Sequence, residues 1–456
     1  MLYHLYETQR ALMAPFSEFA SASSKLYDHP LSPFAHAPMS QRISAGFDLL
    51  HRLAKEYEKP EFEITSARVG DGVDVAVQEQ VALSKPFARL LRFKRFTDNP
   101  QALEIMKGQP TVVVVAPLSG HHSTLLRDTV KSLLHDHKVY IVDWTDARMV
   151  PVEEGPFHLD DYVHYVQDFL RHVGPHAHVI SVCQPTVPVL AAVSLMASAG
   201  EPTPPTMTMM GGPIDARRSA TAVNTLATNK SHSWFENNVI FRVPQNYPGA
   251  GRRVYPGFLQ HSGFVAMNPD RHVSSHYDYF LDLIRGDDDS AEAHRKFYDE
   301  YNAVLDMSAD FYLDTIKTVF QDFALVNGTW KVGGKLVRPQ DITGSALLTI
   351  EGELDDISGA GQTEAAHGLC TGIPASRHAH YNVEGAGHYG IFSGRRWREM
   401  VYPEVRAFIK RFDRVAAKAP ARKAASAKGV SRRPPTPKAV APKSAAVKAT
   451  ARAGRR

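Results

Sequence analysis

One cysteine of this chain lies where a strand-like segment meets a helix-like segment. Cys183 follows the apolar run 178–182 and precedes a segment of helical pattern that begins near Thr186. A sharp turn between a strand and a helix pushes a side chain out above a sheet, and the partial positive charge at a helix N-terminus favours negatively charged groups. The position therefore suits a thiolate nucleophile, although a lone cysteine at the end of a strand is more often inert packing.

An acid and a histidine follow two later strand-like segments. The apolar run 346–352 is followed by Asp355 and Asp356, and the strand-like run 378–383 is followed by His388 in a glycine-rich segment. Nucleophile, acid and histidine in this chain order are typical of α/β-hydrolases, in which the histidine is the general base and the acid orients it. The order predicts a triad of Cys183 and His388 with an acid from the 355–356 pair.

The turn at the cysteine lacks the usual glycines. An elbow of this kind reads Gly-x-nucleophile-x-Gly because backbones crowd there. Here the residues are Ser181-Val-Cys-Gln-Pro185. Serine is small and proline suits the first turn of a helix, so the substitution is physically tolerable. By itself the motif is weak evidence for a nucleophile. The acid and the histidine that follow in the expected chain order strengthen the interpretation.

The oxyanion of an acyl-transfer reaction needs hydrogen-bond donors that face the nucleophile. One predicted donor is the backbone N–H of Gln184. The other is expected from the loop after the Val112–Val115 run, with the backbone of Leu118 and Ser119 as first choice. His121 and His122 in the same loop are either structural or pocket-lining, and the sequence does not separate these alternatives.

Motifs for metals and cofactors are not apparent. The sequence holds no HExxH or CxxC pattern, and no Walker or GxGxxG loop follows a strand-like run. We therefore expect neither a metal nor a nucleotide cofactor.

Short apolar runs alternate with helix-like segments, which are expected at 122–135, 159–172 and 186–199. Runs without polar alternation suit strands that are buried on both faces of a parallel sheet. We predict an α/β-hydrolase fold, a mostly parallel doubly wound sheet whose core comprises 61–218 and 336–413, with paired antiparallel strands over 63–96. The apolar runs are Val112–Val115, Val139–Val142, His178–Val182, Met207–Met210 and Leu347–Ile350.

A long interval, 219–335, interrupts this alternation. It shows no clear buried strand, is helical in parts (291–323) and is rich in aromatic residues. We predict a helical cap that excludes water and shapes the substrate pocket. The alternative is a helical subdomain without a lid role.

Residues 1–60 predict two amphipathic helices that flank a proline-rich loop, 30–38. Apolar residues recur at helical spacing, including Leu5, Leu12 and Phe16. These helices either pack on the body or lie on an apolar surface such as a lipid or polymer particle.

The charge of the chain is unevenly divided. Residues 414–456 contain 13 Lys and Arg and no Asp or Glu, and subtracting these 13 from the net charge of +4 leaves −9 on the remainder. We expect this Lys/Ala/Pro-rich tail to be disordered and to bind polyanions such as nucleic acid weakly and without base specificity. Its alternative role is a solubilising appendage.

Two cysteines in 456 residues do not make a disulfide scaffold and fit a reducing compartment. No signal peptide is visible, and no apolar run approaches the ~18 residues that span a bilayer. We expect a cytoplasmic protein without a transmembrane segment.

Long blocks of the chain resemble intracellular polyhydroxyalkanoate depolymerases. The resemblance implies hydrolysis of stored poly(3-hydroxybutyrate) at the granule surface to 3-hydroxybutyrate oligomers and monomer, with Cys183 as nucleophile and His388 as base. It also favours Asp355 over Asp356, because related synthases carry their acid first in an Asp-His-Ile pattern that aligns with 355–357. The matching blocks include VVAPLSGHHSTLLRDTV, KVYIVDWTDARMVPVEEGPFHLDDY, VISVCQPTVPVLAA, YPGFLQHSGFVAMNPDRH, TIEGELDDISGAGQT and GHYGIFSGRRWRE.

Other functions remain open at this stage. A polymer synthase shares the fold and the cysteine, but synthases usually keep the elbow glycines. A non-catalytic granule coat protein would use the N-terminal helices and the basic tail. In an enzyme, either water or coenzyme A is a chemically reasonable acceptor of the acyl group.

Overall fold

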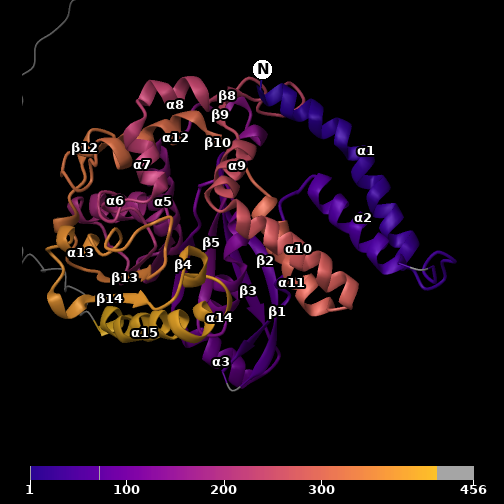
Figure 1. The fold of residues 1–456 in the computed structure, drawn as a ribbon. Helices are drawn as coiled ribbons and strands as arrows, with labels where there is room; N and C mark the ends of the chain where they lie inside the picture. Colours follow the sequence, from indigo (N-terminus) through magenta and orange to yellow (C-terminus); the bar gives the residue numbers. More distant parts are fainter. Residues whose placement is uncertain (1, 38, 71, 419–456) are drawn as a thin grey trace, which may run out of the picture. The chain divides into compact units, whose positions relative to one another are not determined.

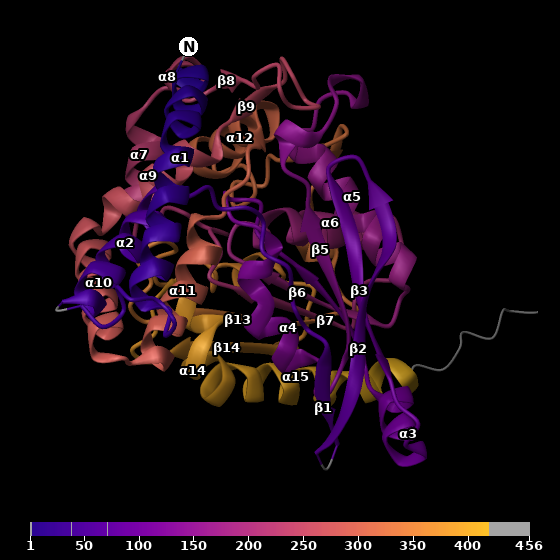
Figure 2. The same cartoon turned by 90° about the vertical axis from the view of Figure 1, so that its right-hand side faces the viewer.

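A nine-stranded sheet forms the centre of the protein, in the order β1-β2-β3-β5-β4-β6-β7-β13-β14 (Figures 1 and 2). The computed structural model describes residues 2–37, 39–70 and 72–418. Strands β1 to β3 and the β3–β5 pair are antiparallel, and the remaining pairs are parallel. The strands are β1 (Ser66–Val69), β2 (Val73–Lys85), β3 (Ala88–Phe96), β4 (Thr111–Val115), β5 (Lys138–Trp144), β6 (Ala177–Val182), β7 (Thr206–Met210), β13 (Ala346–Gly352) and β14 (His378–Val383).

Helices cover both faces of the sheet, which explains the wholly apolar strands. Val113 and Val115 of β4 pack with α5 (Leu159–Val173) and α6 (Thr186–Ser198). Val112 and Val114 point the other way and pack with the helices of the opposite layer. That layer contains α3 (Pro100–Gly108), α4 (Arg127–Leu133) and α15 (Tyr402–Lys418). A mostly parallel sheet between two helical layers, with this strand order, is the α/β-hydrolase fold predicted from the sequence.

The insertion between β7 and β13 is mainly helical. Our expectation that it holds no buried strand was wrong, because β8, β9 and β10 form a small antiparallel sheet in which Val254 and Met307 are buried. Strands of two or three residues are too short to produce a recognisable alternation. The elements are α7 (Ala222–Asn229), α8 (His232–Asn238), β8 (Phe241–Arg242), β9 (Arg253–Tyr255), α9 (Gly257–Met267), α10 (Pro269–Arg285), α11 (Asp288–Asn302), β10 (Met307–Ser308), α12 (Ala309–Thr315) and the hairpin of β11 (Lys331–Val332) and β12 (Lys335–Leu336).

The first 54 residues form the two predicted helices. Helices α1 (Leu2–Asp28) and α2 (Ser40–Ala54) pack side by side, in indigo in Figure 1, and α2 also contacts α10. Most of the apolar residues that recur at helical spacing are exposed, with Leu12 at 67% and Phe16 at 63%. The apolar face of this helical pair is therefore not covered by the described part of the chain.

The C-terminal boundary of the core differs from the prediction. Helix α15 continues to Lys418, so residues 414–418, which we had assigned to a disordered tail, are helical. Alanine and lysine favour helix propagation, and both occur in this segment. The rest of the predicted tail, 419–456, lies outside the described residues. Within the described residues, every helix is too short or too polar to cross a membrane.

A buried polar cluster joins α1, the insertion and the core. The Tyr3 hydroxyl donates to Asp306 Oδ2 (2.6 Å), and the Gly257 N–H donates to Asp306 Oδ1 (2.8 Å). The Asp306 N–H donates to Asp146 Oδ1 (3.2 Å), and Arg148 Nε lies 2.9 Å from Asp146 Oδ2. Burial and the neighbouring Asp306 carboxylate raise the pKa of Asp146 to about 7, although Arg148 opposes the shift. The protein thus binds a proton at Asp146 more tightly when folded than when unfolded.

The raised pKa makes the stability of the protein depend on pH. Because the unfolded chain has an ordinary carboxyl pKa of about 3.9, stability should fall as the pH rises from 4 through 7, by roughly 1–3 kcal/mol. Asp146→Asn should flatten this dependence, as measured by urea unfolding at pH 5 and pH 8. The exposed Asp98→Asn serves as the control. An unaltered slope in Asp146→Asn would contradict the assignment.

Candidate active site

Cys183 occupies a strained turn between β6 and α6. Its φ is +69°, in the left-handed region that residues other than glycine rarely adopt. The turn is fixed on both sides, because the Cys183 N–H donates to Met210 O (2.7 Å) and the Thr186 N–H donates to Cys183 O (3.1 Å). This is the geometry predicted for a nucleophile at a strand-to-helix elbow.

Two glycines on the neighbouring strand relieve the crowding at this turn. A Cβ atom on Gly212 would lie 1.8 Å from Thr186 Oγ1 and 2.6 Å from Cys183 O. A Cβ atom on Gly211, whose φ is +55°, would lie 2.7 Å from the Ile391 side chain and 3.4 Å from Asp355 Oδ2. The space that elbow glycines usually provide is thus provided from the end of β7. We did not identify these residues from the sequence, although a Gly-Gly pair directly after a buried strand was the available signal.

Asp355 and His388 form a buried pair. Asp355 Oδ2 lies 2.8 Å from His388 Nδ1. Asp355 Oδ1 accepts the N–H groups of Ile357 (2.9 Å) and Ser358 (2.8 Å), so three donors hold the carboxylate in place. Since a carboxylate accepts, Nδ1 carries the proton and Nε2 of the ring is left for a second partner. Asp355 can therefore orient His388 in the tautomer that a general base requires.

The electrostatics of the pair favour a charged histidine. Burial lowers the pKa of His388, but the negative charges of Cys183 and Asp355 outweigh burial and raise the pKa well above its ordinary value. Cys183 and His388 both line the same cavity. The charged imidazolium form of His388 is therefore favoured at this site.

Only one of the two candidate acids contacts the histidine. Asp356 is exposed and accepts from the Asn268 side chain (3.1 Å). Asp355 lies at the carboxyl end of β13 with its side chain buried. The geometry therefore places Asp355, and not Asp356, with His388.

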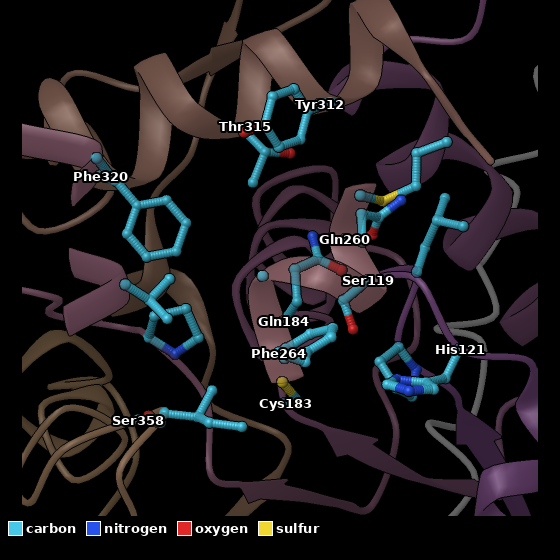
Figure 3. Close-up of a pocket in the computed structure, with 18 of the residues that line it drawn as sticks. Ser119, His121, Cys183, Gln184, Gln260, Phe264, Tyr312, Thr315, Phe320 and Ser358 are labelled. Carbon is cyan, nitrogen blue, oxygen red and sulfur yellow. The ribbon is translucent and has the colours of Figure 1, made fainter. Parts of the chain in front are cut away.

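A cavity of about 380 Å³ is lined by Cys183 and His388, and Figure 3 shows it with Cys183 labelled. The insertion contributes a largely apolar wall, and Tyr312, Thr315 and Phe320 lie opposite Cys183 in Figure 3. The apolar and aromatic lining includes Leu125, Val223, Leu226, Phe235, Phe264, Phe311, Tyr312, Ile316, Phe320, Tyr389 and Phe392. An apolar wall strengthens electrostatic interactions at the reacting atoms and suits an apolar acyl chain.

The three residues predicted for the oxyanion hole line this cavity with Cys183. Among the described residues, no acceptor is bound by the backbone N–H of Gln184, Leu118 or Ser119. The insertion holds the loop after β4 in place, because the Leu305 N–H donates to Gly120 O (2.8 Å). These N–H groups are therefore available as donors, and their role stays a prediction.

The structure separates the roles of the two adjacent histidines. His121 lines the cavity, and its Nε2 donates to Tyr301 O (3.1 Å). Burial lowers its pKa to about 4, so His121 is neutral near pH 7. His122 is also buried, with a pKa lowered by burial to about 3, and does not line the cavity. His121 is therefore a pocket-lining residue, whereas His122 is buried outside the lining.

In the described ranges, no group of three or more His, Cys, Asp or Glu side chains is arranged to hold a metal ion.

Comparisons with known proteins agree with part of the sequence analysis. Residues 211–413 match the family model described as PHB de-polymerase C-terminus, which confirms the resemblance for the segment that holds Asp355, His388 and most of the insertion. Cys183 precedes the matched segment. A search of curated proteins finds no match.

Similar solved structures are distant. They include a 2-hydroxy-6-oxo-6-phenylhexa-2,4-dienoate hydrolase from Rhodococcus sp. strain RHA1, with 14% identity, 74% of this chain and 99% of that chain covered, and a TM-score of 0.39. A monoacylglycerol lipase from Paleococcus ferrophilus has 12% identity, 66% and 95% coverage, and a TM-score of 0.38. Because these TM-scores are below 0.5, the fold is assigned from the strand order and not from these structures.

The contacts of the two neighbouring acids predict unequal effects of mutation. Asp355→Asn should lower kcat/KM for a soluble ester by about 10²–10⁴-fold, because an amide no longer selects the required tautomer. Asp356→Asn, which removes a similar charge one residue away, should stay within about twofold of wild type. Steady-state kinetics on both purified variants would test this. Equal losses in the two would show that His388 does not depend on Asp355.

Proposed function

Because residues 211–413 belong to the PHB depolymerase family, we propose that the protein hydrolyses the ester bonds of stored poly(3-hydroxybutyrate), with Cys183 as nucleophile. The observation that carries the proposal is His388, which is held by Asp355 and lines the same apolar cavity as Cys183. The family match and the fold support an ester hydrolase. The cysteine mechanism and the polymer substrate are the parts we add.

The proposed reaction proceeds through a thioester. The Cys183 thiolate attacks the ester carbonyl carbon, and the backbone N–H groups of Gln184 and Ser119 stabilise the oxyanion. The His388 imidazolium gives its proton to the departing alkoxide, which leaves as the hydroxyl end of the shortened chain. His388 then takes a proton from water, and the hydroxide attacks the thioester. The C–S bond breaks, the carboxylic acid leaves, and the Cys183 thiolate and the His388 imidazolium are restored.

The two cysteines give a matched test of the nucleophile. Cys183→Ala should reduce the release of 3-hydroxybutyrate from amorphous granules by several orders of magnitude. Cys370 is buried, and burial raises its pKa to about 12, so that it stays a thiol. Cys370→Ala should therefore keep the rate within a few-fold of wild type. Chromatography of the released acids gives the rate.

Two outcomes would redirect the proposal. Undiminished release by Cys183→Ala would refute the cysteine mechanism. Steady release of coenzyme A from 3-hydroxybutyryl-CoA, with growth of polymer, would show a synthase instead. Adding coenzyme A to the granule assay tests the acceptor, because mass spectrometry would detect hydroxyacyl-CoA only if a thiol can replace water.

We further propose that the enzyme works at the surface of the cytoplasmic polymer granule and docks there through the apolar face of α1 and α2. Thirteen of the 25 large apolar side chains that are most exposed lie within the first 54 residues. Ten of the thirteen lie on α1 and α2 themselves. Exposed apolar side chains gathered on one part of a protein mark an interaction site. A water-insoluble polyester presents the complementary apolar partner.

Polar substitutions on this face should weaken granule binding without affecting chemistry. The double variant Leu12→Ser, Phe16→Ser should lose about tenfold or more in co-sedimentation with amorphous granules, because less apolar area becomes buried. Its rate on a soluble ester should match wild type, and Leu103→Ser on α3, which is 40% exposed, should bind normally. Unchanged sedimentation of the double variant would contradict the docking role. If wild type is a dimer and the double variant is a monomer, the face would instead bind a second copy of the chain.

A further inference from the structure

Gln184, the residue after the proposed nucleophile, has a buried side chain without a hydrogen-bond partner. The residue is 9% exposed. Among the described residues, neither Nε2 nor Oε1 of its carboxamide meets a partner. The residue lines the same cavity as Cys183, and Figure 3 draws both side chains at that cavity. A buried amide in this state gains from any ligand that satisfies it.

Two other polar side chains of the cavity, those of Gln260 and Thr315, are already bonded within the protein. The Gln260 amide donates to Tyr255 O (3.3 Å) and Leu305 O (3.4 Å). The Thr315 hydroxyl donates to Phe311 O (2.8 Å). Most of the remaining lining is apolar. Among the described residues that line the cavity, Gln184 is the one whose side-chain nitrogen and oxygen are buried without a partner. A polar group on a bound acyl chain would satisfy them.

The chemistry of a carboxamide narrows the choice of that group. Nε2 donates and Oε1 accepts. The interior of a polyester offers carbonyl and ester oxygens, which only accept, and so it would leave Oε1 unpaired. A hydroxyl both donates and accepts, and a poly(3-hydroxyacyl) chain carries one only at its hydroxyl end.

We propose that the Gln184 carboxamide binds the free 3-hydroxyl of the acyl group that Cys183 attacks, so that the enzyme selects the hydroxyl-terminal unit of the polyester. This inference rests on the proposed function and adds a specificity-determining residue to it. The 3-hydroxyl is on the second carbon from the attacked carbonyl carbon, so the two groups are close together in the substrate. Gln184 directly follows Cys183, so the residues that would bind these two groups are also neighbours in the protein. The enzyme would then release hydroxyacid monomers one at a time from the hydroxyl end of the polymer.

The test compares purified full-length enzyme on three soluble esters, p-nitrophenyl 3-hydroxybutyrate, 3-methoxybutyrate and butyrate. Wild type should show a kcat/KM about 10–100-fold higher on the hydroxyacyl ester than on the butyryl ester, because only the former satisfies both amide atoms. The methoxy ester accepts but cannot donate, and it should lose most of this advantage. This measurement needs no variant and does not depend on the folding of one.

Variants then assign the preference to a residue. In Gln184→Met, which keeps the length of the side chain but not its hydrogen bonds, the hydroxyacyl-to-butyryl ratio should fall toward one, whatever happens to the absolute rates. Gln184→Glu keeps an acceptor without the amide donor and should give a reduced ratio. Thr315→Val is the matched control, because its hydroxyl is already bonded to Phe311, and it should keep the wild-type ratio.

The outcomes distinguish this inference from the proposed function. A wild-type ratio near one, or a ratio that Gln184→Met leaves unchanged, would overturn the role of Gln184, and water would then satisfy the amide. Undiminished hydrolysis of all three esters by Cys183→Ala would overturn the proposed mechanism instead. Loss of hydrolysis in Cys183→Ala with a ratio that depends on Gln184 supports both.

Discussion

The left-handed backbone of Cys183 is the constraint on which the rest of the site depends. A residue with a side chain holds a φ of +69° only if its surroundings enforce the turn, and the hydrogen bonds to Met210 and from Thr186 do so. The same turn needs room, which Gly211 and Gly212 provide at the end of the adjacent strand. Because β13 lies next to β7 on its other side, Asp355 and His388 reach the same edge of the sheet.

Much of the fold follows from local sequence pattern. The apolar runs at 112–115, 139–142 and 347–350 are strands because each buries both faces, and such runs have few alternatives in a chain of this composition. The chain order of Cys183, Asp355 and His388 predicted that a site lies at the ends of three strands. In the structure, Asp355 and His388 are in contact. These predictions depend on periodicity and chain order, both of which a single sequence contains.

Other features depend on contacts between distant segments and could not be predicted in this way. Gly211 and Gly212 leave room for the Cys183 turn because β6 and β7 are neighbours in the sheet. A single sequence does not show which strands are neighbours, so this role could not be predicted. The choice between Asp355 and Asp356 requires the direction of two adjacent side chains, and the sequence favoured Asp355 only through resemblance. The exposure of Leu12 and Phe16 depends on what packs against α1, which amphipathic spacing alone does not specify.

The contrast between the two sulfur atoms has a practical consequence. Cys370 is sealed in the core behind α13 (Ala366–Leu369), whereas Cys183 is partly exposed at the cavity. Of the two thiols, a folded molecule therefore offers thiol-directed electrophiles only Cys183, the proposed nucleophile. Mild alkylation of the native protein would therefore label Cys183 in preference to Cys370, and the labelled fraction would report how many molecules keep an accessible Cys183 thiol.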